Sequence, residues 1–232
     1  MLLFSVLTAA VAPGVSLLAY LYLKDRYDSE PIHMVVRMFF LGMLIVVPIV
    51  VLQRGLQLWW GDNPFVFAFA QSAGAEELVK WFVLYHIIYN HTEFDEPYDG
   101  IVYAASISLG FATLENVMYA VFSPATFGTL LMRALLPVSG HALFGIMMGY
   151  YMGKAKFAIS KRSRNWFLSV SLALPFALHG VYDWIMLTQQ QHWMYFIVPF
   201  MIALWTWGLR KMQSANARSP FRFLAREEEV KL

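Results

Sequence analysis

Long apolar runs recur along the whole chain and restrict its fold more than any other feature. They can be drawn at about 2–23, 34–58, 65–89, 99–122, 134–153, 166–188 and 193–209. Each comes close to the roughly 20 residues that an α-helix needs to cross the hydrocarbon core of a bilayer. Only 14% of the residues are charged, against about 25% in a soluble domain. The sequence therefore predicts an all-α, polytopic integral membrane bundle of about seven transmembrane helices.

Basic side chains indicate how this bundle is oriented. Lysine and arginine follow the first, fifth and seventh runs, whereas the loops after the second and sixth runs contain neither. Because short cytoplasmic loops are enriched in these residues, we expect the N-terminus outside and the C-terminus in the cytoplasm. Residues 1–209 would then form a single transmembrane domain, and residues 210–232 a cytoplasmic tail that is first basic and then acidic.

The connection at 123–135 is too long to be a simple loop, and it contains Arg133, which does not belong in lipid. We expect an interfacial or re-entrant piece on the outer side that ends near Pro137. Proline suits the first turn of the helix that follows. This arrangement would place His141 about one turn below the outer surface.

The third run carries three ionisable side chains, Glu76, Glu77 and Lys80. Each such group costs about 2.5–3.5 kcal/mol at the centre of a membrane helix, so this face must point into the bundle. Lys80 follows Glu76 by four positions and Glu77 by three, and both spacings allow an ion pair. Because the two glutamates lie about 100° apart around the axis, we expect one to pair with Lys80 and the other to stay available.

Three later runs add polar side chains. The fourth contains Glu115 and Asn116, the fifth His141, and the sixth His179 and Asp183 at a four-residue spacing. A single histidine in a membrane helix commonly serves packing, but four consecutive runs with buried polar groups are harder to explain in that way. Two imidazoles and several carboxylates are enough to hold a divalent ion with an activated water.

Absent motifs narrow the reaction class. The chain has no HExxH, no GxGD and no cysteine, and Ser139–Gly140 lacks the first glycine of a GxSG motif. No nucleic-acid-binding motif is present, so nucleic acid is not expected as a partner. A catalytic site would depend on the polar side chains of the helices at about 65–188.

The order of the motifs EExxK, EN, H and HxxxD resembles the PrsW family of bacterial membrane proteases, over roughly residues 65–190. That family is related to the clan of CAAX prenyl endopeptidases and Abi proteins, whose motifs are EExxxR, FxxxH and HxxxN. Lys80 stands one position closer than the arginine of the first motif, and Glu115 replaces the histidine of the second, four residues after Phe111. His179 matches the histidine of the third motif, with Asp183 in its polar position.

The resemblance implies a glutamate-dependent intramembrane endopeptidase. Glu76 or Glu77 would accept a proton from the water that attacks the peptide carbonyl. His179 would bind that water or stabilise the oxyanion, and Asn116 is a candidate oxyanion donor. The clan favours the first glutamate as the base, whereas pairing with Lys80 at four-residue spacing would free the second, so both remain candidates.

The resemblance also implies a metallopeptidase. Zinc suits histidine and carboxylate ligands, and the candidate ligands are His141, His179, Glu115 and Asp183. His141 has no counterpart in the three clan motifs. A glutamate and histidine site without metal is chemically adequate as well, so the sequence leaves both forms open.

PrsW proteins are implied in site-1 cleavage of membrane-bound anti-sigma factors. The resemblance therefore implies a multi-pass protein of the bacterial plasma membrane that cuts a single-span substrate near the outer face. The alternative is a proton- or cation-coupled transporter or channel that uses the same buried carboxylates and histidines. Against it, the chain shows no inverted repeat and no paired broken helices.

Overall fold

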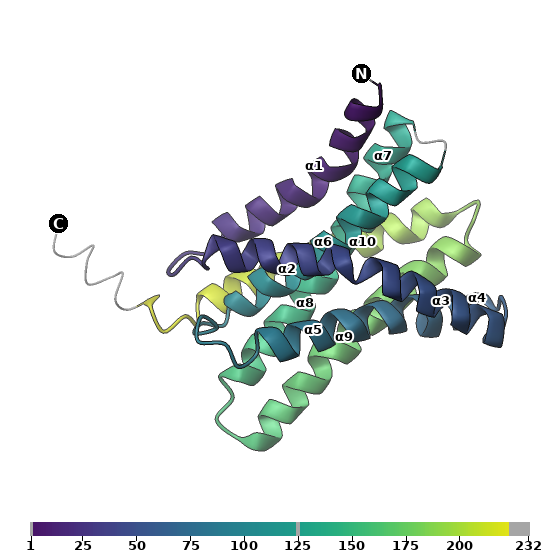
Figure 1. Ribbon diagram of the computed structural model, residues 1–232. Coiled ribbons are helices and arrows are strands. Elements are labelled where there is room, and N and C mark those ends of the chain that lie inside the picture. Colours follow the sequence, from purple (N-terminus) through teal and green to yellow (C-terminus); the bar gives the residue numbers. More distant parts are fainter. Residues whose placement is uncertain (1, 124–125, 223–232) are drawn as a thin grey trace.

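The computed structural model describes residues 2–123 and 126–222, and the regular elements in these ranges are all helical (Figure 1). They form seven rods: α1 (Leu2–Leu23); α2 (Ile32–Leu44) with α3 (Val46–Trp60); α4 (Pro64–Val66) with η1 (Phe67–Gly74) and α5 (Ala75–Ile87); α6 (Asp99–Phe122); α7 (Phe127–Arg133) with η2 (Ala134–Val138) and α8 (Ser139–Lys156); α9 (Lys161–Thr188); and α10 (Trp193–Asn216). The segments η1 and η2 are π-helical. The predicted all-α bundle is confirmed.

Helices long and apolar enough to cross a membrane are Ser5–Leu23, Ile32–Trp60, Asp99–Phe122, Phe127–Lys156 and Lys161–Thr188. The rod from α4 to α5 is less apolar because it carries the three ionisable side chains, and α10 because its last turns are polar. Both still pack within the bundle, η1 against α9 and α10 against α8. The protein is therefore a multi-pass membrane protein.

The expected end of the outer piece near Pro137 is not found, whereas its interfacial location stays a prediction. Residues 124–125 lie outside the described residues, but Phe127–Lys156 is one continuous helical rod. Pro137 lies inside the π-helical segment η2, where the wider turn accommodates a ring that lacks an N–H donor. Arg133 is half-buried, and its Nε donates to Asn116 Oδ1 at 2.8 Å.

The centre of the bundle is formed by α6 and α8. In the most apolar 18-residue stretch of each rod, 78% of the residues are buried in α6 and 67% in Phe127–Lys156, which contains α8, compared with 17% in α1. Glycine lets the two backbones approach: a Cβ on Gly145 would lie 2.9 Å from the Ala104 carbonyl oxygen, and one on Gly149 would lie 2.7 Å from Ile101 Cα. Small residues allow this close packing of membrane helices, and it brings the polar positions of α6 and α8 together.

The connections that carry the basic residues meet at one end of the bundle. Asn216 Nδ2 donates to the carbonyl oxygen of Lys24 at 3.1 Å, and Lys211 Nζ to the Tyr151 hydroxyl at 3.4 Å. Helix α10 continues to Asn216, beyond the expected start of the tail at residue 210. The acidic end of that tail, residues 223–232, lies outside the described residues. The orientation of the bundle in the membrane stays a prediction.

Candidate active site

The segment η1 sets the direction of the catalytic candidates on α5. Within this segment, Gln71 Nε2 donates to the Gly61 carbonyl at 3.2 Å, and Ser72 Oγ lies 3.5 Å from Glu76 Oε1. Single π turns inside α-helices are frequent at functional sites. Here the π-helical stretch ends at Gly74, two residues before Glu76.

Lys80 lies between both carboxylates rather than beside one of them. Its Nζ is 3.2 Å from Glu76 Oε2, 2.9 Å from Glu77 Oε1 and 3.2 Å from His141 Nδ1. The expected choice of a single partner was wrong, because the long lysine side chain reaches between two positions that diverge around the helix. An ammonium group can donate three hydrogen bonds and accepts no hydrogen bond. These three contacts therefore satisfy it, and His141 Nδ1 must be the acceptor.

Each histidine of the site is held at both ring nitrogens. His141 Nε2 lies 3.1 Å from Glu115 Oε2, while its Nδ1 faces Lys80. His179 Nδ1 lies 2.9 Å from Glu77 Oε1, and its Nε2 lies 3.4 Å from Asp183 Oδ2. The two rings meet edge to face, with centroids 5.0 Å apart. Such partners fix the orientation of an imidazole ring.

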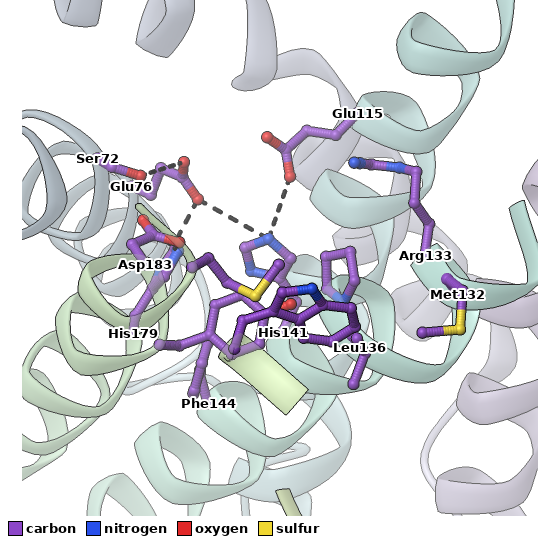
Figure 2. A pocket seen from close by; sticks show the side chains of 14 residues that line it. Ser72, Glu76, Glu115, Met132, Arg133, Leu136, His141, Phe144, His179 and Asp183 are labelled. Atoms are coloured by element: carbon purple, nitrogen blue, oxygen red, sulfur yellow. Dashed lines mark hydrogen bonds and ion pairs between the residues drawn. The ribbon is translucent and has the colours of Figure 1, made fainter. Parts of the chain in front are cut away.

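A cavity of about 390 Å³ opens beside this cluster (Figure 2). Its lining comes from five of the rods and consists of Ser72, Glu76, Glu115, Met132, Arg133, Leu136, Pro137, His141, Phe144, His179, Tyr182, Asp183, Met186 and Trp193. Figure 2 shows Glu76 directed toward both histidines, with Oε2 at 4.0 Å from His141 Nε2 and from His179 Nδ1. Glu77 is completely buried and does not line the cavity. The two neighbouring glutamates therefore differ in access to a substrate.

The donor set of the cluster fits a metal ion. Glu76, Glu77, His141 and His179 each offer one ligand atom, and these atoms all lie within 4.8 Å of one another. Nitrogen and oxygen donors of this kind are typical of zinc. Glu77 Oε2 is buried and has no hydrogen-bond partner among the described residues, which leaves one carboxylate oxygen free for such an ion.

Two of the expected ligands take another position. Glu115 and Asp183 each contact a histidine at a ring nitrogen and are not members of the compact four-residue cluster. Both line the cavity. Carboxylates that contact the second nitrogen of a ligating histidine orient the ring and raise its basicity. Asp183 fits this arrangement, because it contacts His179 Nε2 while Nδ1 faces Glu76 and Glu77. Glu115 contacts His141 Nε2, the nitrogen that also faces Glu76.

Asn116 is not brought to the cavity. Its Nδ2 donates to the Ala10 carbonyl oxygen at 2.8 Å, its Oδ1 accepts from Arg133, and the side chain is completely buried. With both polar atoms engaged, it ties α1, α6 and α7 together, and it does not line the cavity where an oxyanion would form. The adjacent position in the motif, Glu115, does reach the site.

Sequence reasoning missed two neighbours of the cluster, Gln53 and Phe144, and used Phe111 only to match the family motif. Gln53 Nε2, from α3, donates to Glu76 Oε1 at 3.1 Å. The Phe111 ring lies 4.1 Å from Lys80 Nζ, and Phe144 stacks on His179 with centroids 4.9 Å apart. Phe144 follows His141 within the same helix, a spacing that could have pointed to it, whereas Gln53 carries no local signal.

Comparisons with known proteins agree with this geometry. The family model described as "PrsW family intramembrane metalloprotease" matches residues 30–207. The Protease PrsW of Geobacillus kaustophilus is 53% identical over 215 residues, covering 92% of this chain and 93% of that protein. The Protease PrsW of Bacillus subtilis is 49% identical over 216 residues, covering 93% and 97%. The Protease PrsW of Clostridioides difficile is 31% identical over 211 residues, covering 88% of both chains.

No solved structure matches the chain significantly. The similarity to curated proteases extends over the helices that build the cavity, and the peptidase class predicted from the motifs is confirmed. The transporter alternative is not favoured by these relatives. The chain belongs to the PrsW family of intramembrane metalloproteases.

Proposed function

We propose that Glu76 is the general base of this protease. The observation that carries the proposal is its position: it is the glutamate of the pair that lines the cavity, and its Oε2 lies 4.0 Å from a ring nitrogen of each histidine. Gln53, Ser72 and Lys80 hold its carboxylate in place. A general base must lie within reach of the proton that it accepts, and Glu77 is enclosed by other contacts.

The chain's own residues account for the proton transfers. A water in the cavity gives a proton to Glu76 as its oxygen attacks the carbonyl carbon of the scissile peptide bond, and the same carboxyl then passes the proton to the leaving amine. His179 is placed to bind the water or to stabilise the oxyanion, with Asp183 holding its ring. Lys80 fixes the relative position of the two glutamates.

A metal ion would be held by His141, His179 and Glu77, whose Oε2 atom is buried without a hydrogen-bond partner in the described part of the chain. When bound, such an ion supplies Lewis acidity that polarises the carbonyl group or acidifies the attacking water. Asp183 would orient His179 through Nε2, and Glu115, at His141 Nε2, would be a further candidate ligand. This assignment leaves Glu76 on the cavity wall as the base.

The proposed substrate is a single-span membrane protein, such as an anti-sigma factor, cut near the outer face of the bacterial plasma membrane. The cavity is lined near the end of α9 by Met186 and at the start of α10 by Trp193. This end of the bundle is opposite to the one where the basic connections gather, so the basic-residue rule places it outside.

The test uses the purified full-length chain in detergent or liposomes with a single-span substrate peptide. We expect Glu76→Gln to reduce the cleavage rate by at least about 100-fold, because general base catalysis contributes roughly 10²–10⁴-fold. His179→Ala and Glu77→Gln should also reduce it. Asp62→Asn, a change of an exposed acidic residue outside the cavity lining, is the control. Wild-type cleavage by folded Glu76→Gln protein would refute the assignment.

A further inference from the structure

A second group of carboxylates lies at the opposite end of the bundle from the active site. Asp25 belongs to the connection between α1 and α2, Glu96 to the connection between α5 and α6, and Asp99 is the first residue of α6. One carboxylate oxygen of each lies within 4.8 Å of the others. Two ligands on opposite sides of a calcium ion are separated by about the same distance, since Ca–O bonds measure about 2.4 Å.

These carboxylates are buried, and most of their oxygen atoms have no partner. Glu96 is completely buried, Asp99 is 1% exposed and Asp25 is 9% exposed. Both oxygens of Asp25, both of Glu96 and Oδ1 of Asp99 lack a hydrogen-bond partner among the described residues. Buried polar atoms are nearly always hydrogen-bonded, so five free carboxylate oxygens in one place point to a ligand.

A fourth carboxylate borders the group. Tyr103, one turn after Asp99 on α6, donates its hydroxyl to Glu30 Oε2, and Glu30 Oε1 is buried without a partner among the described residues. Burial raises the pKa of Glu30 to about 8. Burial and the neighbouring Glu96 raise the pKa of Asp25 to about 9. These shifts reflect negative charges that are crowded and poorly solvated.

Basic side chains do not neutralise the group. Within residues 2–123 and 126–222, the ion pairs are confined to the active-site cluster. Lys156, at the same end of the bundle, uses its Nζ to donate to the Tyr89 carbonyl at 2.7 Å. Among the described residues, Oδ2 of Asp99 accepts the backbone N–H groups of Asp95 and Glu96. Buried charge without a counter-ion costs several kcal/mol per group.

An acidic opening leads toward this group from the surface. A cavity of about 220 Å³ is lined by Asp28, Ser29, Glu30, Pro31, Glu93 and Asp95. Glu30 thus belongs both to the cavity wall and to the buried group. Clefts lined by one sign of charge concentrate ions of the opposite sign, so the opening provides an entry path for a cation.

We propose that Asp25, Glu96 and Asp99 bind a hard divalent cation, with Glu30 as a further oxygen donor. Ligands that are all oxygens suit calcium or magnesium rather than zinc. The site is separate from the catalytic one: Asp99 and Glu115 lie 16 residues apart on α6, roughly 24 Å along the helix. A bound cation would hold the α1–α2 and α5–α6 connections against the start of the central helix.

The competing explanation is that the carboxyl groups share protons and need no cation. A first measurement separates the two: unfolding of the full-length wild-type protein in detergent, monitored by circular dichroism at neutral pH after chelation. We expect added Ca²⁺ or Mg²⁺ to raise the Tm by roughly 5–10 °C at saturation. Separate titrations with each ion show which one binds. A Tm that responds to neither ion would overturn the proposal.

The variant Glu96→Gln keeps the shape of the side chain and removes the charge. It should lose the cation-dependent rise in Tm and bind the selected ion at least about tenfold more weakly in isothermal titration calorimetry. Asp25→Asn should behave in the same way if Glu96→Gln does not fold. Asp62→Asn, an exposed aspartate between α3 and α4, is the matched control and should respond like the wild type. An unchanged affinity in both cluster variants would also overturn the proposal.

Discussion

Replacing Lys80 with methionine should destabilise the bundle more than any exposed charge change. Lys80 and Glu77 have completely buried side chains, and that of Glu76 is 5% exposed. Without the ammonium group, two adjacent buried carboxylates lose their shared counter-ion. Removing one partner of a buried ion pair costs about 3–5 kcal/mol. For a chain of this size, 1 kcal/mol corresponds to roughly 2–4 °C, so the Tm should fall by about 6–20 °C.

The assay is thermal unfolding of the purified protein in a mild detergent, followed by circular dichroism. The double variant with Lys80→Met and Glu77→Gln should recover at least about half of the lost stability, because it removes one of the two uncompensated charges. Lys161→Met, a change of an exposed lysine at the start of α9, should shift the Tm by no more than about 2 °C. The reasoning would be refuted if Lys80→Met unfolded at the wild-type temperature, or if the second change lowered the Tm further.

Three further outcomes can be measured on the same preparations. Gly149→Ala should lower the Tm by about 2–12 °C, since its Cβ would press on the α6 backbone and overpacking costs about 1–3 kcal/mol. Gly55→Ala is the control and should leave the Tm unchanged, because the space around its Cβ is open. Equal effects of the two changes would contradict the packing argument. Asn116→Ala should lower the Tm because it leaves the Ala10 carbonyl and Arg133 unpaired, while cleavage per folded molecule stays near wild type; a selective loss of cleavage would restore its expected catalytic role. Chelation followed by zinc should abolish and then restore cleavage in wild-type protein and in Glu96→Gln alike; activity that survives chelation would favour a metal-free site.

The polar residues of the site were largely predictable because of the environment that the apolar runs impose. A charged group inside a membrane helix must face other polar groups, so Glu76, Glu115, His141 and His179 could be expected to meet. The expectation holds in the structure, where ring nitrogens and carboxylate oxygens lie 3–4 Å apart. Asn116 does not join the site as expected, because an uncharged amide is also satisfied by a backbone carbonyl in a neighbouring helix.

The difference between the two glutamates was not predictable. Their helical spacing to Lys80 allowed either pair, and the structure contains both. What separates them is the position of α9 and α3: His179 contacts Glu77 directly, and Gln53 holds Glu76 at the cavity wall. Such contacts depend on how the rods pack, and nothing within the local sequence records them.

The acidic residues of the α1–α2 and α5–α6 connections show the same limit more clearly. In sequence, Asp25 and Glu96 appear in two short polar connections, where each would be read as solvated. The packing of α1, α2 and α6 encloses them instead. The sequence alone could not indicate that these carboxylates are buried, because no apolar run surrounds their positions.

The sequence by itself determined that the chain is a helical membrane bundle with a polar site inside it. Twenty-residue apolar runs and buried charges have few physical solutions in a bilayer, where every backbone group must be hydrogen-bonded within the protein. Only the tertiary structure decided that Lys80 bridges both glutamates, that Glu76 faces the cavity and that a second carboxylate group is buried at the other end. Those features depend on contacts between helices that are far apart in the chain. Side-chain packing determines these contacts to within a few ångströms.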